Sequence, residues 1–356
     1  ENPKPTRHCN PDAPTAVPAA ACWRRAALPA LITPCASQIM IDNEYLRERR
    51  EFFAVLVGII AIFAIFALTY TLNDDGWGAE SEGGIGDVAG YCERIQAGVI
   101  REPANTWSNL PFILVGLYVL WRMQYDSRNG LPSLSNRSWF TLMYGVACIA
   151  VGVGSFAMHG FNTDWGGWLD LSGMMMYITM PVFYNFSRFF RWSEREFCTW
   201  YLGANAILST LHWYYGIGGF VWGFAIAIWL AQETAIRYQR QPLAIFLAPI
   251  AGIIILVNYN PVDFVREQVG VIIFMALLAW FLYRLDEIRL QRTHTPYFWC
   301  GSAAYLLASF IWRASQQGGG MCEPDSLLQG HALWHILGAV AMFCFYRYFR
   351  TEVNNY

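Results

Sequence analysis

Two histidines near the C-terminus, His331 and His335 in QGHALWHILGA, have a spacing that suits a shared metal ion. Residues four apart lie on one face of a helix, one turn apart. The pair alone is weak evidence, because buried histidines are commonly hydrogen-bonded core residues. A third candidate ligand is His159 in GSFAMHGF. His212 in LSTLHWYY is a substitute candidate, although we favour a structural role for it.

The segment that carries His159 also contains Ser155 and Asp170. Ser155 would share the helical face of His159, and a bond back to a helix carbonyl is the alternative. Asp170 follows WGGWL and is expected inside the next helix, where its carboxylate needs a partner; a helix N-cap is the alternative. Three histidines with an open fourth position are typical of catalytic zinc, and a carboxylate beside the zinc-activated water acts as general base.

The elements that position these side chains are expected to be membrane helices. Of 356 residues, 55% are hydrophobic and 14% are charged, whereas soluble domains carry about a quarter charged residues. The net charge of −2 gives no indication of nucleic-acid binding. Apolar runs near the length of about 20 residues that spans lipid predict about ten transmembrane helices. These runs are 52–71, 105–122, 139–158, 167–187, 197–215, 218–236, 243–258, 268–284, 297–314 and 329–348.

Arginine alternates between the loops that join these runs, and this alternation predicts an orientation. Arginine-rich loops precede the first run and follow the second, fourth, sixth, eighth and tenth. Since arginine marks cytoplasmic loops, both termini are predicted to be cytoplasmic. Ser155, His159, Asp170, His331 and His335 then share the non-cytoplasmic face, where polar groups in a membrane indicate function.

Two loop cysteines, Cys92 and Cys322, fall at the same predicted face. A disulfide can persist there, so we predict a Cys92–Cys322 bond; two free thiols are the alternative. The nine cysteines contain no CxxC pair, which disfavours a zinc ribbon or a dithiol redox motif.

The chain divides into three predicted regions. Residues 1–39, rich in proline and alanine, are expected to be a disordered presequence or an extension ahead of translation from Met40, outside the fold. Residues 40–89 are expected to form an extra transmembrane helix and an acidic loop. Residues 90–350 are expected to form the catalytic transmembrane domain.

The motifs together resemble a superfamily of seven-helix membrane hydrolases. It contains the alkaline ceramidases, the progestin/adiponectin receptors and the Per1-type lipid-remodelling proteins. Three blocks in order, across roughly residues 90 to 348, are similar to alkaline ceramidases. They are YCERIQAGVIREPANTWSNLPFILVGL, GVGSFAMHGFNTDWGGWLDLSGMMMY and CEPDSLLQGHALWHILGA.

This resemblance implies a zinc amidase. Zinc would be held by His159, His331 and His335, Asp170 would activate the zinc-bound water, and Ser155 would stabilise the oxyanion. The implied reaction is hydrolysis of ceramide-type N-acyl sphingoid lipids, which are linear amides, to a fatty acid and a sphingoid base. A comparable disulfide occurs in the family. A lipid-sensing receptor or another lipid hydrolase of the superfamily is the alternative.

The sequence departs from the family in two respects. The family's calcium-binding segment is matched by Glu93 and Glu102, but glycine and isoleucine occupy two other ligand positions, so calcium is a candidate only. These glutamates could instead pair with Arg94 or Arg101. One helix also precedes the core, and the stretch between the aspartate and the late histidines is long. We therefore expect an all-α polytopic membrane protein with a seven-helix core and extra helices.

Overall fold

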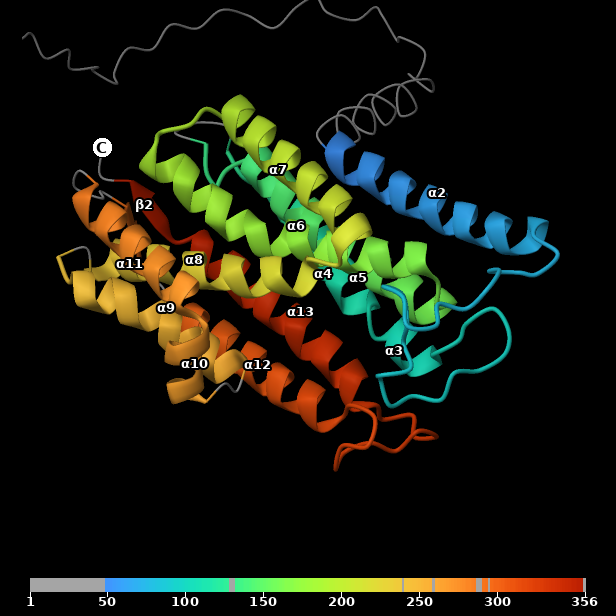
Figure 1. Cartoon of the computed structure of the whole chain (residues 1–356). Helices are drawn as coiled ribbons and strands as arrows, with labels where there is room; N and C mark the ends of the chain where they lie inside the picture. The colour runs from blue at the N-terminus through green and yellow to red at the C-terminus, as the bar shows by residue number, and fades with distance from the viewer. Residues whose placement is uncertain are drawn as a thin grey trace, which may run out of the picture. The chain divides into compact units, whose positions relative to one another are not determined.

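The computed structural model describes residues 49–127, 132–238, 240–257, 260–285, 290–293 and 295–354. The expected N-terminal extension, residues 1–39, lies outside these ranges. In the described ranges most of the chain is helical and almost none is strand, which confirms the all-α class (Figure 1). Only two short strands accompany the helices there, β1 (Leu290–Arg292) and β2 (Glu352–Asn354), which pair antiparallel.

Each of the ten predicted apolar runs contains a helix. The helices are α2 (Arg50–Leu72), α3 (Pro103–Trp107), α4 (Leu110–Met123), α5 (Trp139–Phe161), α6 (Asp164–Phe189), α7 (Glu194–Tyr215), α8 (Gly218–Tyr238), α9 (Pro242–Val257), α10 (Pro261–Glu267), α11 (Val269–Arg284), α12 (Thr295–Ala314) and α13 (Gly330–Phe349). The predicted 105–122 run is divided into α3 and α4, and α10 was not predicted.

Four of the described helices are long and apolar enough to cross a bilayer, namely α2, α5, α8 and α13. The number rises to five if α9 and α10 form one bent span. These helices are compatible with an integral membrane protein. The other described helices are shorter or less apolar, so the count of ten spans remains a prediction.

The turn between α5 and α6 explains why the two helices form a tight hairpin. Asn162 ends α5 in the left-handed conformation, at φ 49°, and its N–H donates to the Met158 carbonyl. Thr163 then caps α6 by accepting a hydrogen bond from the Gly166 N–H. A left-handed C-cap followed at once by an N-cap reverses the chain within two residues.

Glycines allow the backbones of α5 and α6 to approach closely. A Cβ on Gly154 would lie 2.4 Å from the Leu169 carbonyl oxygen, and one on Gly173 would lie 2.5 Å from the Ala150 oxygen. Only residues without a side chain fit at such distances. This close packing places Ser155 of α5 beside Asp170 of α6.

The last helix, α13, packs between helices that are distant from one another in the sequence. It packs along α12 and also contacts α3 and α4 (Figure 1). The largest buried apolar cluster includes side chains from α5, α6, α8 and α13, among them Tyr144, Tyr184, Trp229 and Phe345. The first turns of α13 thereby lie next to the C-terminal end of α5.

Candidate metal centre

Three buried histidines converge where α5 ends and α13 begins. His159, His331 and His335 are 1%, 4% and 3% exposed, and one ring nitrogen from each lies within 4.8 Å of the others. The Nε2 atoms of His159 and His331 are 3.1 Å apart. Two nitrogens bound to one tetrahedral zinc at about 2.0–2.1 Å are roughly 3.3 Å apart, so the three rings fit a common ion.

Neighbouring side chains orient two of the rings. Glu102 Oε2 lies 2.5 Å from His159 Nδ1, whose N–H it accepts when ionised. Ser108 Oγ donates to the Asn105 carbonyl at 2.7 Å and lies 2.7 Å from His335 Nδ1. Because the serine proton is already used, the serine oxygen accepts the His335 Nδ1–H. Both Nε2 atoms are therefore left as acceptors, as in zinc sites whose ligands are held by a second layer of hydrogen bonds.

Ser155 and Asp170 lie beside the histidines. Ser155 Oγ is 3.4 Å from His335 Nε2 and also hydrogen-bonds the Asp170 carboxylate. Both side chains are buried, and Asp170 lies within α6 rather than at its N-cap, which is Thr163. The alternatives of a serine bonded only to its helix carbonyl and of a capping aspartate are thus disfavoured by these contacts.

The five side chains form one end of a cavity of about 810 Å³. Typical small-molecule sites have about 300–1,000 Å³. The remaining wall is mostly apolar and comes from α6, α8, α9, α12 and α13. Its side chains include Met174, Tyr177, Trp222, Ile255, Tyr305 and Trp334. The arrangement places polar chemistry at the end of a space suited to a hydrocarbon chain.

The comparison with protein families agrees with this geometry. The model of the family described as Ceramidase matches residues 89–355. The chain belongs to the ceramidase family. The resemblance inferred from the three sequence blocks is thereby confirmed. None of the curated proteins matches the chain.

In this ceramidase-family chain, Glu93 caps the short helix α3. Its two carboxylate oxygens accept the N–H groups of Ala104 and Asn105 at 2.7 and 2.8 Å. An anionic group is favourable at a helix N-terminus. Burial raises the pKa of Glu93, while the two N–H groups act in the opposite direction. The carboxylate therefore has a structural partner in the protein.

The ionisation of the buried Glu102 carboxyl depends on a nearby positive charge. Burial raises its pKa to about 9. A cation held by His159 would favour the ionised form, since an opposite charge within about 4–6 Å stabilises a carboxylate. The second oxygen, Oε1, has no hydrogen-bond partner among the described residues.

The alternative prediction, that these two glutamates pair with the neighbouring Arg94 or Arg101, is wrong. Arg94 pairs with Asp325, with N–O distances of 2.6 and 2.8 Å, and Arg101 pairs with Glu80. The arginines lie next to the glutamates in sequence, but their side chains point to other loops. Glu93 and Glu102 instead turn toward α3 and the histidines.

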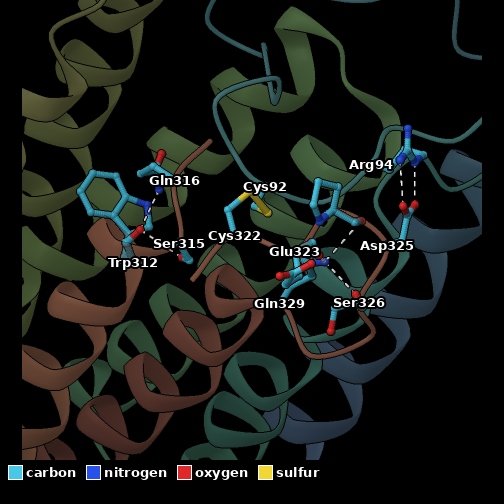
Figure 2. The surroundings of a disulfide bond; sticks show 11 residues. Cys92, Arg94, Trp312, Ser315, Gln316, Cys322, Glu323, Asp325, Ser326 and Gln329 are labelled. Atoms are coloured by element: carbon cyan, nitrogen blue, oxygen red, sulfur yellow. Dashed lines mark hydrogen bonds and ion pairs between the residues drawn. A yellow bond between two sulfur atoms is a disulfide. The ribbon is translucent and has the colours of Figure 1, made fainter. Parts of the chain in front are cut away.

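The predicted Cys92–Cys322 disulfide is confirmed, and it joins the loops that precede α3 and α13 (Figure 2). The Arg94–Asp325 pair connects the same loops. Next to the disulfide, the Tyr91 ring lies 4.1 Å from the His331 ring, centroid to centroid. The disulfide therefore anchors the loop segment that holds an aromatic ring over the histidine centre.

His212 lies outside the three-histidine group and has a structural contact. Its Nδ1 accepts the Gly218 N–H at 3.2 Å, across the turn between α7 and α8. The structural role that we favoured from the sequence agrees with this contact.

Sequence reasoning missed two contacts, that of Ser108 with His335 and that of the Tyr91 ring with His331. The sequence contains one signal for both, since Ser108 and Tyr91 lie in the first of the three blocks that resemble alkaline ceramidases. Nothing in their spacing from the histidines indicates that they meet, because the separation from Ser108 to His335 is 227 residues.

Proposed function

We propose that the chain is a zinc-dependent intramembrane hydrolase that cleaves ceramide-type N-acyl sphingoid lipids to a fatty acid and a sphingoid base. The observation that supports this most strongly is the convergence of His159, His331 and His335 at the end of a mostly apolar cavity. Membership of the ceramidase family supports an amide of a lipid as the substrate.

The three histidines would hold the zinc ion through their Nε2 atoms. Zinc bound there would supply a Lewis acid for the amide carbonyl and would lower the pKa of a water to about 7. Glu102 and Ser108 would keep the rings of His159 and His335 in the required tautomer and orientation.

The protein side chains would then move the protons. Asp170 would accept a proton from the attacking water and later deliver it to the amine nitrogen as the C–N bond breaks. Ser155, which contacts both Asp170 and His335, would donate its O–H to the developing oxyanion. Water is thereby divided between the two products, with its oxygen in the carboxylic acid and a proton on the amine.

The membrane arrangement is also part of the proposal. The alternation of arginine-rich loops supports cytoplasmic termini and an active site toward the non-cytoplasmic face. A ceramide-like substrate would enter from the bilayer. Residues 90–350 would form the catalytic domain, and residues 40–89 an additional helix and loop.

Calcium at Glu93 and Glu102 remains a candidate. The buried Oε1 of Glu102, with the side-chain amide of Asn105 beside this carboxylate, supports a further ligand next to α3. Both Glu93 oxygens already accept backbone N–H groups, so a calcium ion would have to share them.

Asp170→Asn gives the most direct functional test. The protein purified in detergent is expected to hold one zinc ion and to release fatty acid from ceramide. The variant should keep its zinc but lose about 10²–10⁴-fold in kcat, because it lacks the proton acceptor.

Two results would contradict the proposal. Full activity of Asp170→Asn would remove the general-base role. A wild-type protein that holds zinc but cleaves no N-acyl lipid would instead favour the lipid-sensing receptor or a hydrolase of other lipids.

A further inference from the structure

The cavity extends from the histidine centre along most of the bundle. On α13 its lining residues run from His331 to Phe345, and on α12 from Arg313 to Phe298. At 1.5 Å per residue, the two stretches are about 21 and 23 Å long. One leaflet contributes about half of a 30 Å hydrocarbon core, so the cavity is long enough for one extended chain of a bilayer lipid.

Three aromatic side chains from three helices lie close together toward the far end of this cavity, where the lining on α8 continues past them to Thr234. Trp229 of α8, Phe298 of α12 and Phe345 of α13 all line it. The Trp229 and Phe345 rings meet edge to face at 4.9 Å, and Phe298 lies 6.0 Å from Trp229 and 6.3 Å from Phe345. We call these three residues the aromatic floor.

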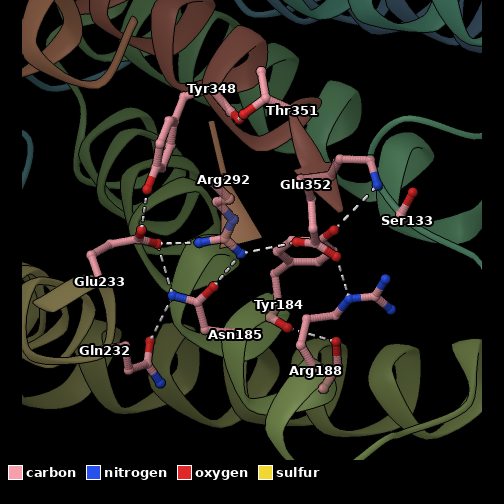
Figure 3. A network of polar contacts seen from close by, with 12 residues as sticks. Ser133, Tyr184, Asn185, Arg188, Gln232, Glu233, Arg292, Tyr348, Thr351 and Glu352 are labelled. Atoms are coloured by element: carbon pink, nitrogen blue, oxygen red, sulfur yellow. Dashed lines mark hydrogen bonds and ion pairs between the residues drawn. The ribbon is translucent and has the colours of Figure 1, made fainter. Parts of the chain in front are cut away.

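The aromatic floor contacts a buried ionic network around Glu233 and Arg292, and Figure 3 shows this network. The Trp229 indole N–H donates to Glu233 Oε1 at 3.0 Å, and Arg292 contacts the same oxygen at 2.5 Å. Tyr348 donates to the other Glu233 oxygen at 2.7 Å, and its ring lies 5.2 Å from Phe298. A hydrocarbon chain that went deeper would separate buried charges, which is strongly unfavourable.

We propose that Trp229, Phe298 and Phe345 determine the longest hydrocarbon chain that the site accepts. The ionic network around Glu233 prevents a longer chain from displacing the side chains of the aromatic floor. This inference rests on the proposed function, because it takes the cavity as the site of a substrate chain. That chain is either the acyl chain or the sphingoid base.

Phe345→Ala removes part of the floor and is the main test. Activity of the purified protein, as kcat/KM, is measured over two series of ceramides, one varied in acyl length and one in sphingoid length. Wild type should show a sharp upper limit in one series. In Phe345→Ala that limit should rise by two carbons, and a chain two carbons past the wild-type limit should gain about 15-fold relative to the optimum, since each buried methylene contributes roughly fourfold.

Phe343→Ala is the matched control. Phe343 lies on the same helix two residues before Phe345, packs against Tyr118 of α4 with ring centroids 5.4 Å apart, and does not line the cavity. Its truncation should destabilise the protein and leave the length profile unchanged. An equal shift in both variants would show general loosening of the bundle and overturn the proposal, as would an unchanged profile in Phe345→Ala.

Ala341→Leu tests the opposite direction. Ala341 lines the cavity one turn before Phe345 on the same face of α13. A larger side chain there should lower the upper limit, and an unchanged limit would contradict the proposed depth.

A binding assay separates this proposal from the proposed function. Displacement of a fluorescent fatty acid by saturated fatty acids of increasing length reports cavity depth without turnover. If wild type cleaves no N-acyl lipid, the function fails, but the binding limit and its rise in Phe345→Ala still support the aromatic floor. Binding that shows no limit, or the same limit in both proteins, would overturn it.

Discussion

The bundle contains two buried polar clusters near opposite ends of α13, and they differ in how their charges are matched. The histidine centre lies at the start of the helix, around His331. The ionic network lies at its end, around Tyr348, and includes Arg292, Glu233 and Glu352. Both clusters place polar atoms in an apolar interior, but only the first borders the cavity with its charged or metal-binding groups.

In the ionic network, opposite charges neutralise one another. Arg292 contacts Glu233 at 2.5 Å and Glu352 at 3.1 Å, and Arg188 contacts Glu352 at 2.7 Å. Asn185 donates to Glu233 and accepts from Arg292. These contacts tie α6, α8, β1 and β2 together, so the network is a structural one.

At the histidine centre, hydrogen-bond acceptors outnumber the donors that could pair with them. The hydrogen bonds of Glu102 and Ser108 leave the Nε2 atoms of His159 and His335 as acceptors, close to His331. Converging lone pairs repel one another unless a proton or a cation lies between them. Matched charges in this bundle therefore indicate a structural role, whereas unmatched acceptors beside a cavity indicate a binding site.

The largest effect that separates the two clusters is expected for His331→Ala. Loss of a ligand should abolish stoichiometric zinc and lower ceramide hydrolysis at least about a thousandfold, which corresponds to about 4 kcal/mol. Metal analysis and an activity assay on the purified protein check this. The control is His212→Ala, which should keep both zinc and rate; retention of zinc by His331→Ala would contradict the assignment.

Arg292→Met should affect stability without affecting zinc. The substitution leaves Glu233 and Glu352 buried without their cation, and breaking a buried pair in this way costs about 3–5 kcal/mol. Denaturation in detergent measures the loss, and metal analysis of the remaining folded protein should give full zinc occupancy. Unchanged stability, or loss of zinc from folded protein, would erase the distinction between the clusters.

Smaller effects are expected where the protein only orients a ligand. Glu102→Gln and Ser108→Ala should each weaken zinc binding about 10–100-fold, because His159 then bonds a neutral amide in place of a carboxylate and His335 loses the acceptor at its Nδ1–H. Competition with a chelator measures the affinity. Ser155→Ala is a useful comparison, since it should lower the rate more than the affinity. Unaltered zinc affinity in both orienting variants would contradict the roles given to Glu102 and Ser108.

Local features of the sequence predicted much of the fold. The lengths of the apolar runs predicted where the helices lie. The four-residue spacing of His331 and His335 predicted that they share one face of α13. The alternation of arginine brought Cys92 and Cys322 to one side, and their bond is present. These inferences depend on residues near in sequence or on the simple topology of a helical bundle.

Contacts between distant segments could not be predicted. Arg237 follows Glu233 by four residues, yet the ion pair of Glu233 is with Arg292, 59 residues away. The orienting contact of Ser108 with His335 spans 227 residues. Such partners depend on how side chains pack in the folded bundle. The periodicity of apolar residues in the sequence carries no information about that packing.

X-ray absorption at the zinc edge of the purified wild-type protein shows whether the three histidines hold a zinc ion. We expect one zinc ion per chain with three histidine nitrogens at about 2.0–2.1 Å and an oxygen ligand, and loss of this spectrum in His331→Ala. A protein without zinc, or zinc bound by thiolate sulfur at about 2.3 Å, would contradict it.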